Sequence, residues 1–230
     1  MVAWTGKPAY NRSVIPLRDV NPPGRTPVVT YVLIAINVAV FGYEVSLGSH
    51  LDKFIYTWGL VPARFVPATV LTSMFLHGGL LHVVGNMWFL HIFGDNVEDR
   101  MGPALYLPFY LVAGAVACVA QVVMNPDSTM PMVGASGAIA GVTGAYMVYY
   151  PRARVRTLVP LVFVLYTMDI PAGVFLAFWF FLQLQGGCAT YGADGGGVAF
   201  WAHVGGFLVG ALAAAVIRGR DRAWRDAYAS

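Results

Sequence analysis

Apolar stretches long enough to cross a lipid bilayer occupy most of this sequence, and polar side chains capable of chemistry lie inside them. The stretch Gly134–Gly137 (Gly-Ala-Ser-Gly) opens one of these runs, and Ala202–Gly206 (Ala-His-Val-Gly-Gly) lies inside another. Of the 230 residues, 58% are hydrophobic and 11% are charged, with a mean hydropathy of +0.65. Soluble domains carry roughly one quarter charged residues. Because ionisable side chains are costly within a membrane span, the pattern predicts a multi-pass membrane protein with a functional site in its interior.

Six apolar stretches are predicted to cross the membrane as helices. The first, Val28–Leu47, has 20 residues, which as a helix is about 30 Å, the thickness of the hydrocarbon core. The fourth, Ser136–Tyr150, has only 15 residues, about 22 Å, so Ser136 is expected to lie below the outer surface. The predicted fold class is an all-α membrane protein, a six-transmembrane-helix bundle with a short, centrally placed fourth helix. The remaining spans are Leu71–Phe93, Ala104–Met124, Ile170–Gln185 and Val198–Ile217.

The regions outside the spans divide the chain into three parts. Residues 1–27 are predicted to be a cytoplasmic tail, because they are basic and proline-rich and lack the early apolar core of a cleavable signal. Residues 28–217 form one membrane domain, and residues 218–230 form a second cytoplasmic tail. Leu158–Met168 is an apolar piece of 11 residues that contains Pro160. It is too short to span, so we predict that it is interfacial or re-entrant.

The distribution of lysine and arginine orients the six predicted spans. If both ends lie on one side, the tails and loops of that side hold twelve of the fourteen basic residues, and the opposite loops hold Lys53 and Arg64. Cytoplasmic loops carry the excess of Lys and Arg in membrane proteins, so both termini are predicted to be cytoplasmic. The loop before Ser136 then lies on the outer side. The twelve residues are Lys7, Arg12, Arg18, Arg25, Arg100, Arg152, Arg154, Arg156, Arg218, Arg220, Arg222 and Arg225.

The formal net charge of +3 does not indicate a nucleic-acid partner, because the arginines that orient the spans account for nearly all of it. Cys118 and Cys188 lie at different predicted depths and make no disulfide framework. The residue pattern calls for no cofactor and no metal. The compact size and short tails favour a bacterial plasma membrane as the location.

Ser136 and His203 are the candidate nucleophile and general base. A serine hydroxyl is a weak nucleophile until a neighbouring base activates it, and histidine is suited to that work near neutral pH. Each residue precedes a Gly-xxx-Gly pattern, which begins at Gly137 and at Gly206. Such patterns let membrane helices approach closely, as a hydrogen bond of about 2.6 to 3.2 Å requires. A serine in a small-residue patch is by itself more often a packing device, so the prediction depends on both residues.

His82 and Asn86 are the candidate oxyanion-stabilising residues. They are four residues apart in the second span and therefore project from one helix face. The ring N–H of His82, the amide of Asn86 and the backbone amides at the start of the fourth span can all donate hydrogen bonds to a developing negative charge. A polar seam between helices would explain either residue alone. Together with Ser136 and His203, they favour an oxyanion site.

A third, acidic member of a catalytic triad is not predicted. Glu44, Asp95 and Asp169 lie near the ends of the first, second and fifth spans, away from the predicted depth of the imidazole. The sequence therefore predicts a Ser-His dyad in which packing and hydrogen bonds orient His203.

These motifs resemble those of the rhomboid family of intramembrane serine proteases. The resemblance comes from His77–Asn86, Gly134–Gly137 and Ala202–Gly206 with Gly210, in that order on spans two, four and six. It implies a six-helix core, Ser136 as nucleophile, His203 as general base, and His82 and Asn86 at the oxyanion. It also implies that the chain is a serine endopeptidase, whose substrates are the transmembrane segments of other proteins within the lipid bilayer. His77, Glu98 and Arg100 match family positions with structural roles.

Two positions differ from the pattern of many family members. An adjacent Trp-Arg pair is common in the first outer loop, whereas Trp58 and Arg64 are separated here. In some members a tyrosine four residues after the nucleophile packs on the catalytic histidine, and here that position is Ala140. What orients the imidazole is therefore left open by the sequence.

Three other functions are alternatives to proteolysis. A catalytically inactive rhomboid-like protein that binds membrane proteins usually lacks the nucleophile or the base, and both are present here. A haem protein could use His77 and His91, 14 residues apart on one predicted helix, but span six offers only His203 as a partner. A channel or transporter would show matched broken helices or a run of intramembrane charges, which this sequence does not contain.

Overall fold

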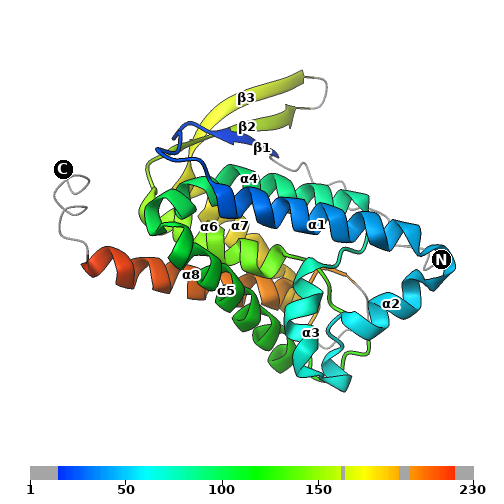
Figure 1. Cartoon of the computed structure of the whole chain (residues 1–230). Helices are drawn as coiled ribbons and strands as arrows, with labels where there is room; N and C mark the ends of the chain where they lie inside the picture. Colours follow the sequence, from blue (N-terminus) through cyan, green and yellow to red (C-terminus); the bar gives the residue numbers. More distant parts are fainter. Residues whose placement is uncertain (1–14, 162–163, 192–196, 221–230) are drawn as a thin grey trace.

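The computed structural model describes residues 15–161, 164–191 and 197–220, and consists mainly of helices packed side by side (Figure 1). The helices are α1 (Val28–Ser46), α2 (Leu51–Trp58), α3 (Pro67–Thr72), α4 (Leu80–Met101), α5 (Pro103–Met124), α6 (Ser136–Tyr149), α7 (Ala172–Ala189) and α8 (Phe200–Arg220). Helices α1, α5, α7 and α8 are long and apolar enough to cross a membrane, and a bent unit of α3 and α4 would make a fifth span. The molecule is therefore a helical membrane bundle. The predicted features at residues 1–14, 192–196 and 221–230 lie outside the described residues.

Helix boundaries follow the predicted spans except at the second one. Helices α1, α5 and α6 agree with their predicted ranges to within one residue at each end, and α7 and α8 to within four. The predicted second span, Leu71–Phe93, is wrong at both ends. Its first residues belong to α3 and a 3-10 turn, and the chain then bends by 87° before α4 begins at Leu80. The bend falls at the Gly78-Gly79 pair. Hydropathy does not reveal it, because the sequence stays apolar on both sides.

The polar end of α4 continues the helix because its charged side chains are used in helix packing. Both carboxylate oxygens of Glu98 accept backbone N–H bonds from the start of α1, at 2.9 Å from Val29 and 2.7 Å from Thr30. These are donors that have no partner within α1, so the carboxylate caps its N-terminus. Glu98 is buried for this reason, and it holds the first turn of α1 against the last turns of α4.

A three-stranded antiparallel sheet shows that the prediction of an all-α protein is wrong. Strands β2 (Arg154–Leu161) and β3 (Val164–Pro171) form a hairpin, and β1 (Ile15–Asp19) pairs with β2. The hairpin contains the apolar piece that was predicted to be interfacial or re-entrant. Val155 and Thr157 are buried, whereas Arg154 and Arg156 are more exposed, which is the period of two that a half-buried strand shows. The hairpin projects from the side of the bundle, with β1 next to α4 (Figure 1).

Strand β1 is attached to the helices by polar contacts of its own side chains and backbone. Trp88 Nε1 donates to the Pro16 carbonyl at 2.6 Å. The Asp19 carboxylate accepts from the Tyr146 hydroxyl at 2.7 Å and from Asn96 Nδ2 at 2.8 Å. Asp19 thus joins β1 to both α4 and α6, and residues assigned from sequence to the first tail are part of the folded structure.

The pH dependence of folding should reveal the Asp19 contact. Burial raises the pKa of Asp19 to about 6, opposed by the hydrogen bond from Tyr146. The folded chain therefore holds this proton more tightly than the unfolded chain, and stability from the protonated form is lost as pH rises from about 4 through 6. We expect the unfolding midpoint of Asp19→Asn, measured relative to the parent in detergent, to rise between pH 4 and pH 7.

Asp169 provides a control of opposite sign for that experiment. Its carboxylate binds Arg156 at 2.8 and 3.1 Å, and this hydrogen-bonded ion pair lowers the pKa of Asp169. The stability that it contributes is present above its unfolded pKa and is lost as pH falls. The midpoint of Asp169→Asn should therefore fall relative to the parent as pH rises through the acid range. Parallel pH profiles for the parent and Asp19→Asn would contradict the prediction.

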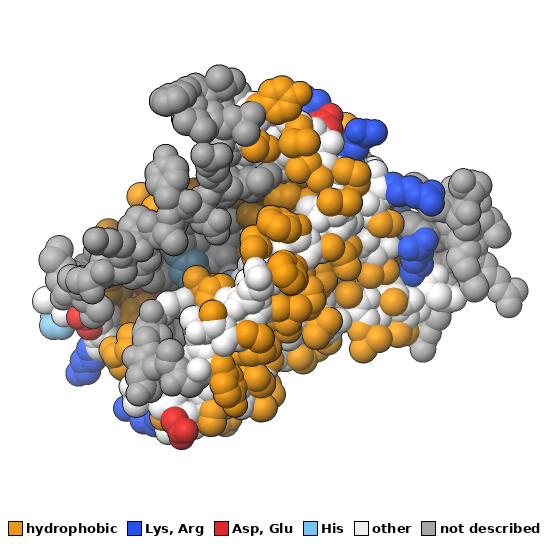
Figure 2. Space-filling model, turned by 180° about the vertical axis from the view of Figure 1, so that it is seen from behind, with side chains coloured by type: hydrophobic (Ala, Val, Ile, Leu, Met, Phe, Trp, Pro, Cys, Tyr) orange, Lys and Arg blue, Asp and Glu red, His pale blue; other side chains and the backbone are white. Residues whose placement is uncertain are grey.

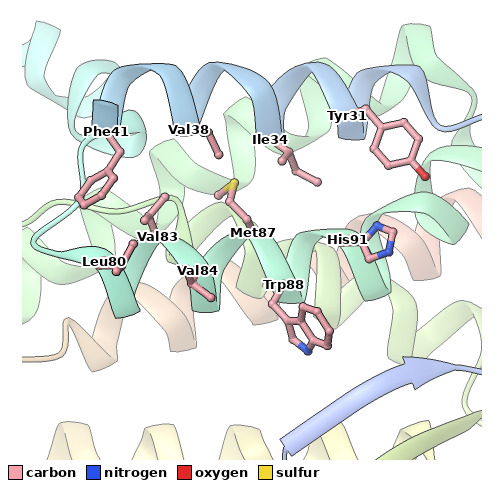
Figure 3. A pocket seen from close by; sticks show the side chains of 10 residues that line it. All are labelled: Tyr31, Ile34, Val38, Phe41, Leu80, Val83, Val84, Met87, Trp88 and His91. Carbon is pink, nitrogen blue, oxygen red and sulfur yellow. The ribbon is translucent and has the colours of Figure 1, made fainter. Parts of the chain in front are cut away.

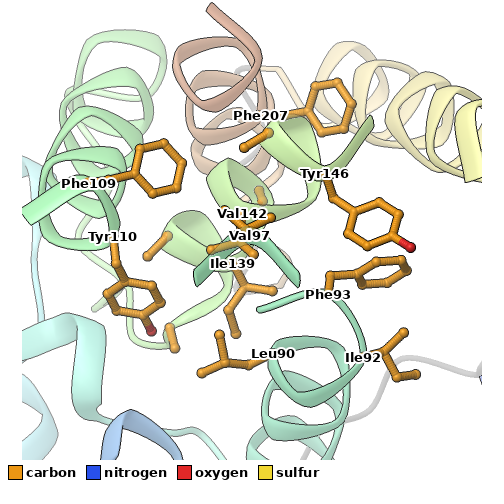
Figure 4. Close-up of a cluster of buried hydrophobic side chains, with 14 of the residues drawn as sticks. Leu90, Ile92, Phe93, Val97, Phe109, Tyr110, Ile139, Val142, Tyr146 and Phe207 are labelled. Carbon is orange, nitrogen blue, oxygen red and sulfur yellow. The ribbon is translucent and has the colours of Figure 1, made fainter. Parts of the chain in front are cut away.

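The hydrophobic core is built around α6. Eleven of its fourteen residues are buried, and α4, α5, α7 and α8 all contact it. Ile139, Val142 and Tyr146 of this helix point among side chains of the neighbouring helices, including Phe93 and Phe207 (Figure 4). Phe93 packs edge-on against Tyr146, with ring centroids 5.0 Å apart. Such dense packing around α6 fixes the position of its first residue, Ser136.

Apolar side chains also cover much of the outer surface. Seen from behind, they spread over the middle of the bundle, while Lys and Arg side chains lie toward its ends (Figure 2). A groove of about 490 Å³ lies between α1 and α4 (Figure 3). Neither Ser136 nor His203 lines it, so it is separate from the candidate site. The lining residues are Tyr31, Ile34, Val38, Phe41, Leu80, Val83, Val84, Met87, Trp88 and His91.

Candidate active site

Ser136 and His203 meet between α6 and α8. The distance from Ser136 Oγ to His203 Nε2 is 2.8 Å, which is that of a hydrogen bond. Ser136 is the first residue of α6 and is half-buried, whereas His203 lies in the first turn of α8 and is buried. The structure thus brings together two residues that are 67 positions apart in the chain.

Glycines on the facing sides of α6 and α8 make this approach possible. A Cβ atom at Gly206 would overlap the Gly137 carbonyl oxygen, and one at Gly210 would overlap the Gly141 carbonyl oxygen. The two backbones are therefore in direct contact along both predicted Gly-xxx-Gly patterns, as expected for small residues at a membrane helix interface. Because Gly206 lies one turn from His203 and Gly137 follows Ser136, this contact sets the separation of the two side chains.

The far side of the imidazole is held by α7. His203 Nδ1 lies 2.8 Å from Gln183 Oε1, and the Trp179 ring packs beside the imidazole, with centroids 5.8 Å apart. Neither residue was identified from the sequence. The signal was present, because Gln183 is a polar residue in an apolar span and lies one helical turn after Trp179. These contacts orient the imidazole, where Ala140 provides no aromatic ring.

His82 and Asn86 face the loop that leads into Ser136. A Cβ atom at Gly134 would lie 2.8 Å from His82 Nε2 and 3.5 Å from Asn86 Nδ2. Gly134 adopts a φ of 126°, which favours glycine, so the loop can pass closely over both side chains. The Gly78 amide donates to His82 Nδ1 at 3.4 Å, which leaves the hydrogen of a neutral His82 on Nε2, on the side of the loop.

Asn86 carries an unused donor at this place. Its Nδ2 is buried and has no hydrogen-bond partner among the described residues. Unpaired buried donors are costly, and each one in a folded protein calls for an explanation. The backbone amides in the first turn of α6 also lack partners within the helix. His82 and Asn86 thus present donors beside Gly134, two residues before Ser136.

The carboxylates of Glu44 and Asp169 bind groups other than His203. Both oxygens of buried Glu44 accept the His77 backbone N–H, at 3.1 and 3.2 Å. The His77 ring in turn packs edge-on against His82, with centroids 5.2 Å apart. Asp169 binds Arg156 of the hairpin. The Nδ1 atom of His203 is satisfied by the amide of Gln183.

The haem alternative required His77 and His91 on one straight helix, and this arrangement is wrong. His77 precedes the start of α4 at Leu80, on the far side of the bend. His91 lies on α4 with its ring stacked on Tyr31, at a centroid distance of 6.2 Å. Within the described ranges, no three His, Cys, Asp or Glu side chains are grouped so as to hold a metal ion.

Comparison with known proteins agrees with the resemblance seen in the motifs. The model of the rhomboid domain matches residues 64–220. The chain is 28% identical over 192 residues to rhomboid protein 1, mitochondrial, of Saccharomyces cerevisiae, covering 79% of this chain and 51% of the yeast protein. It is 28% identical over 196 residues to rhomboid protease GluP of Bacillus subtilis, covering 83% of this chain and 35% of that protein.

A third relative shows that the similarity extends to animals. Presenilin-associated rhomboid-like protein, mitochondrial, of Rattus norvegicus is 27% identical over 124 residues, covering 53% of this chain and 33% of that protein. The chain spans about half of the yeast relative and about a third of the Bacillus one. The matched region contains α4 to α8 and every candidate site residue. The resemblance is thereby confirmed, and this integral membrane protein is a member of the rhomboid family.

Proposed function

We propose that this chain is an intramembrane serine endopeptidase that cleaves transmembrane segments of other membrane proteins with a Ser-His dyad. The 2.8 Å contact between Ser136 Oγ and His203 Nε2 is the observation that carries this proposal. The name of the GluP relative, a rhomboid protease, supports it. The Asn86 donor, which has no hydrogen-bond partner among the described residues and lies close to Gly134 in the loop before the serine, supports the second element that acyl transfer needs.

The proposed reaction begins with attack of Ser136 Oγ on a substrate peptide carbonyl, while its proton passes to His203 Nε2. The carbonyl oxygen becomes an oxyanion, which accepts hydrogen bonds from Asn86, His82 and the Ser136 amide. Collapse of this intermediate breaks the C–N bond, and the leaving amine takes the proton from His203. Water then attacks the acyl-enzyme with His203 as base, which releases the carboxylic acid product and restores the serine.

The proposed topology places six membrane helices, α1 and α4 to α8, with both ends and the sheet on the cytoplasmic side of a bacterial plasma membrane. Helix α6, with 14 residues, is about 21 Å long and stops short of a full bilayer. Ser136 at its start then lies below the outer surface, where irregular backbone can line a water-filled cavity. Because a hydrogen-bonded helix shields its carbonyls, we expect cleavage near small or helix-breaking substrate residues.

A covalent probe tests the proposal without knowledge of the substrate. A fluorophosphonate transfers its phosphorus to the serine oxygen with loss of fluoride, and it requires an activated hydroxyl. We expect the parent protein in lipid to be labelled at Ser136, and His203→Ala to be labelled far more slowly. The inactive rhomboid-like binder would bind membrane segments without being labelled, and that result in lipid and in several detergents would overturn the proposal.

Asn86→Ala should separate a catalytic role from a structural one. Removing one oxyanion donor typically costs about 10² to 10³ in turnover, so the variant should be slow yet detectable. Its stability should be unchanged or slightly higher, because Asn86 Nδ2 makes no hydrogen bond to any described residue. The measurements are kcat on a transmembrane substrate and thermal unfolding in detergent.

Asn96 on the same helix provides the matched control for Asn86. Its side chain donates to Asp19 and accepts from Asn21, so Asn96→Ala should lose stability and keep its turnover at a permissive temperature. If Asn86→Ala lost stability but not turnover, the oxyanion role of Asn86 would be wrong.

A further inference from the structure

The amide of Gln183 can hold only one tautomer of His203 in the observed arrangement. Gln183 Oε1 lies 2.8 Å from His203 Nδ1, and an amide oxygen can accept a hydrogen bond but cannot donate one. The hydrogen of a neutral imidazole must therefore be on Nδ1. The other ring nitrogen, Nε2, is then free to accept the Ser136 hydroxyl at 2.8 Å. This is the tautomer that a general base needs.

The orientation of the Gln183 amide is itself fixed by α7. Its Nε2 donates to the Trp179 carbonyl, one turn earlier, at 3.3 Å. If the amide were turned around, its oxygen would face that carbonyl oxygen, so two acceptors would oppose each other. Its NH₂ group would then point at His203 and favour the unproductive tautomer. The Trp179 carbonyl thus selects the amide orientation, and the amide selects the tautomer.

Burial makes this selection strong. Gln183 and His203 are each only 9% exposed, so water is a poor substitute for either partner. An amide also avoids the cost of placing a carboxylate at this depth in a membrane protein. Trp179 adds a packing contact to one face of the imidazole. A single helix, α7, therefore supplies both restraints on the ring.

We propose that Gln183 is the positioning residue of the dyad, setting the tautomer of His203 through a neutral amide, and that Trp179 limits the tilt of the ring. This inference rests on the proposed function and specifies how its base is made competent. Helix α7 makes most of its helix contacts with α8, and Val174, Phe178 and Phe181 are exposed on its outer side. The ability of His203 to act as a base therefore depends on the contact between α7 and α8.

Kinetics of three variants test the proposal in the full-length protein in lipid. Gln183→Leu keeps the volume but removes the acceptor, so kcat and the Ser136 labelling rate should fall on the order of 10², the lower range for general base catalysis, with KM little changed. Gln183→Glu restores an acceptor for Nδ1, so its kcat and labelling rate should be at least tenfold higher than those of Gln183→Leu. Gln185 is an exposed glutamine on the same helix, so Gln185→Leu should behave as the parent.

A spectroscopic readout reports the tautomer directly. In protein labelled with ¹⁵N-histidine, the His203 signals are assigned by their loss in His203→Ala. The parent should show a protonated Nδ1 and an unprotonated Nε2, and Gln183→Leu should show a mixture of both tautomers. A role of Gln183 in packing alone would change stability without changing this ratio.

The outcomes separate this inference from the proposed function. If the parent is not labelled at Ser136, the proposed function fails. If the parent is labelled and Gln183→Leu is labelled equally fast, the positioning role is overturned while the function stands. The inference is also overturned if the parent carries its His203 hydrogen on Nε2, or if Gln183→Glu is as slow as Gln183→Leu.

Discussion

Ser136→Ala is expected to abolish proteolysis and probe labelling together. Loss of the nucleophile in another serine protease lowers kcat by about 2 × 10⁶, and a fall on the order of 10⁶ is expected here because no second hydroxyl lies within reach of His203 Nε2 among the described contacts. Turnover of a transmembrane substrate and covalent labelling in lipid are the two measurements.

The fold should survive this substitution. Ser136 is half-buried, and the bond lost to His203 is worth about 0.5 to 1.5 kcal/mol, so thermal unfolding in detergent should shift only slightly. Ser46→Ala serves as the control, because that exposed hydroxyl bonds only to its own helix, at the Tyr43 carbonyl. It should keep full labelling. Undiminished cleavage by Ser136→Ala would refute the proposed mechanism.

Gly206→Ala is expected to cost both stability and activity, although it adds a single methyl group. The new Cβ would overlap the Gly137 carbonyl oxygen, which belongs to the backbone of α6 and cannot move aside as a flexible side chain could. Overpacking of this kind costs about 1 to 3 kcal/mol. The helices must separate to accept the methyl group, and the 2.8 Å contact between Ser136 and His203 lengthens with them.

Gly219→Ala on the same helix is the matched control. A Cβ at Gly219 meets no atom of the described residues within 4 Å, and alanine is favoured over glycine in a helix by about 1 kcal/mol. This variant should therefore be as stable as the parent or slightly more so, with unchanged labelling. Thermal unfolding and the Ser136 labelling rate of the two variants give the comparison. Parent-like labelling of Gly206→Ala would show that the backbone contact between α6 and α8 does not determine the separation of Ser136 and His203.

Hydropathy predicted the helices best where burial and lipid exposure both demand apolar residues. The range of α5 agrees within one residue, because its span is apolar throughout and ends at a strong turn signal, Asn125-Pro126. It failed where polar residues are satisfied by distant partners. Helix α4 continues beyond Phe93 because Glu98 caps α1. The Thr30 amide that Glu98 binds is 68 positions away in the chain, so no local pattern encodes this contact.

The hairpin was missed for a related reason. A short apolar run fits a strand, a buried helix segment and an interfacial segment equally well by length. Pairing decides among them, and here Val155 of β2 has partners both in β3, at Ile170, and in β1, at Asp19. The last of these comes from a segment that composition alone assigned to a soluble tail.

The sequence by itself was enough to identify the candidate reactive groups. Ser136, His203, His82 and Asn86 are conspicuous because polar side chains inside apolar spans are costly, and the glycines beside the first two indicate that their helices can touch. Chemistry and spacing are local properties, so a single sequence can show them.

Only the tertiary structure decided how the imidazole is held. Gln183 reaches His203 across 20 residues, whereas Gln185, a second polar residue two positions further along the same apolar stretch, is exposed. Which of the two faces α8 depends on the rotation of α7 against its neighbours. That rotation is set by packing over the whole helix, and for this reason the proposed tautomer of His203 depends on the fold.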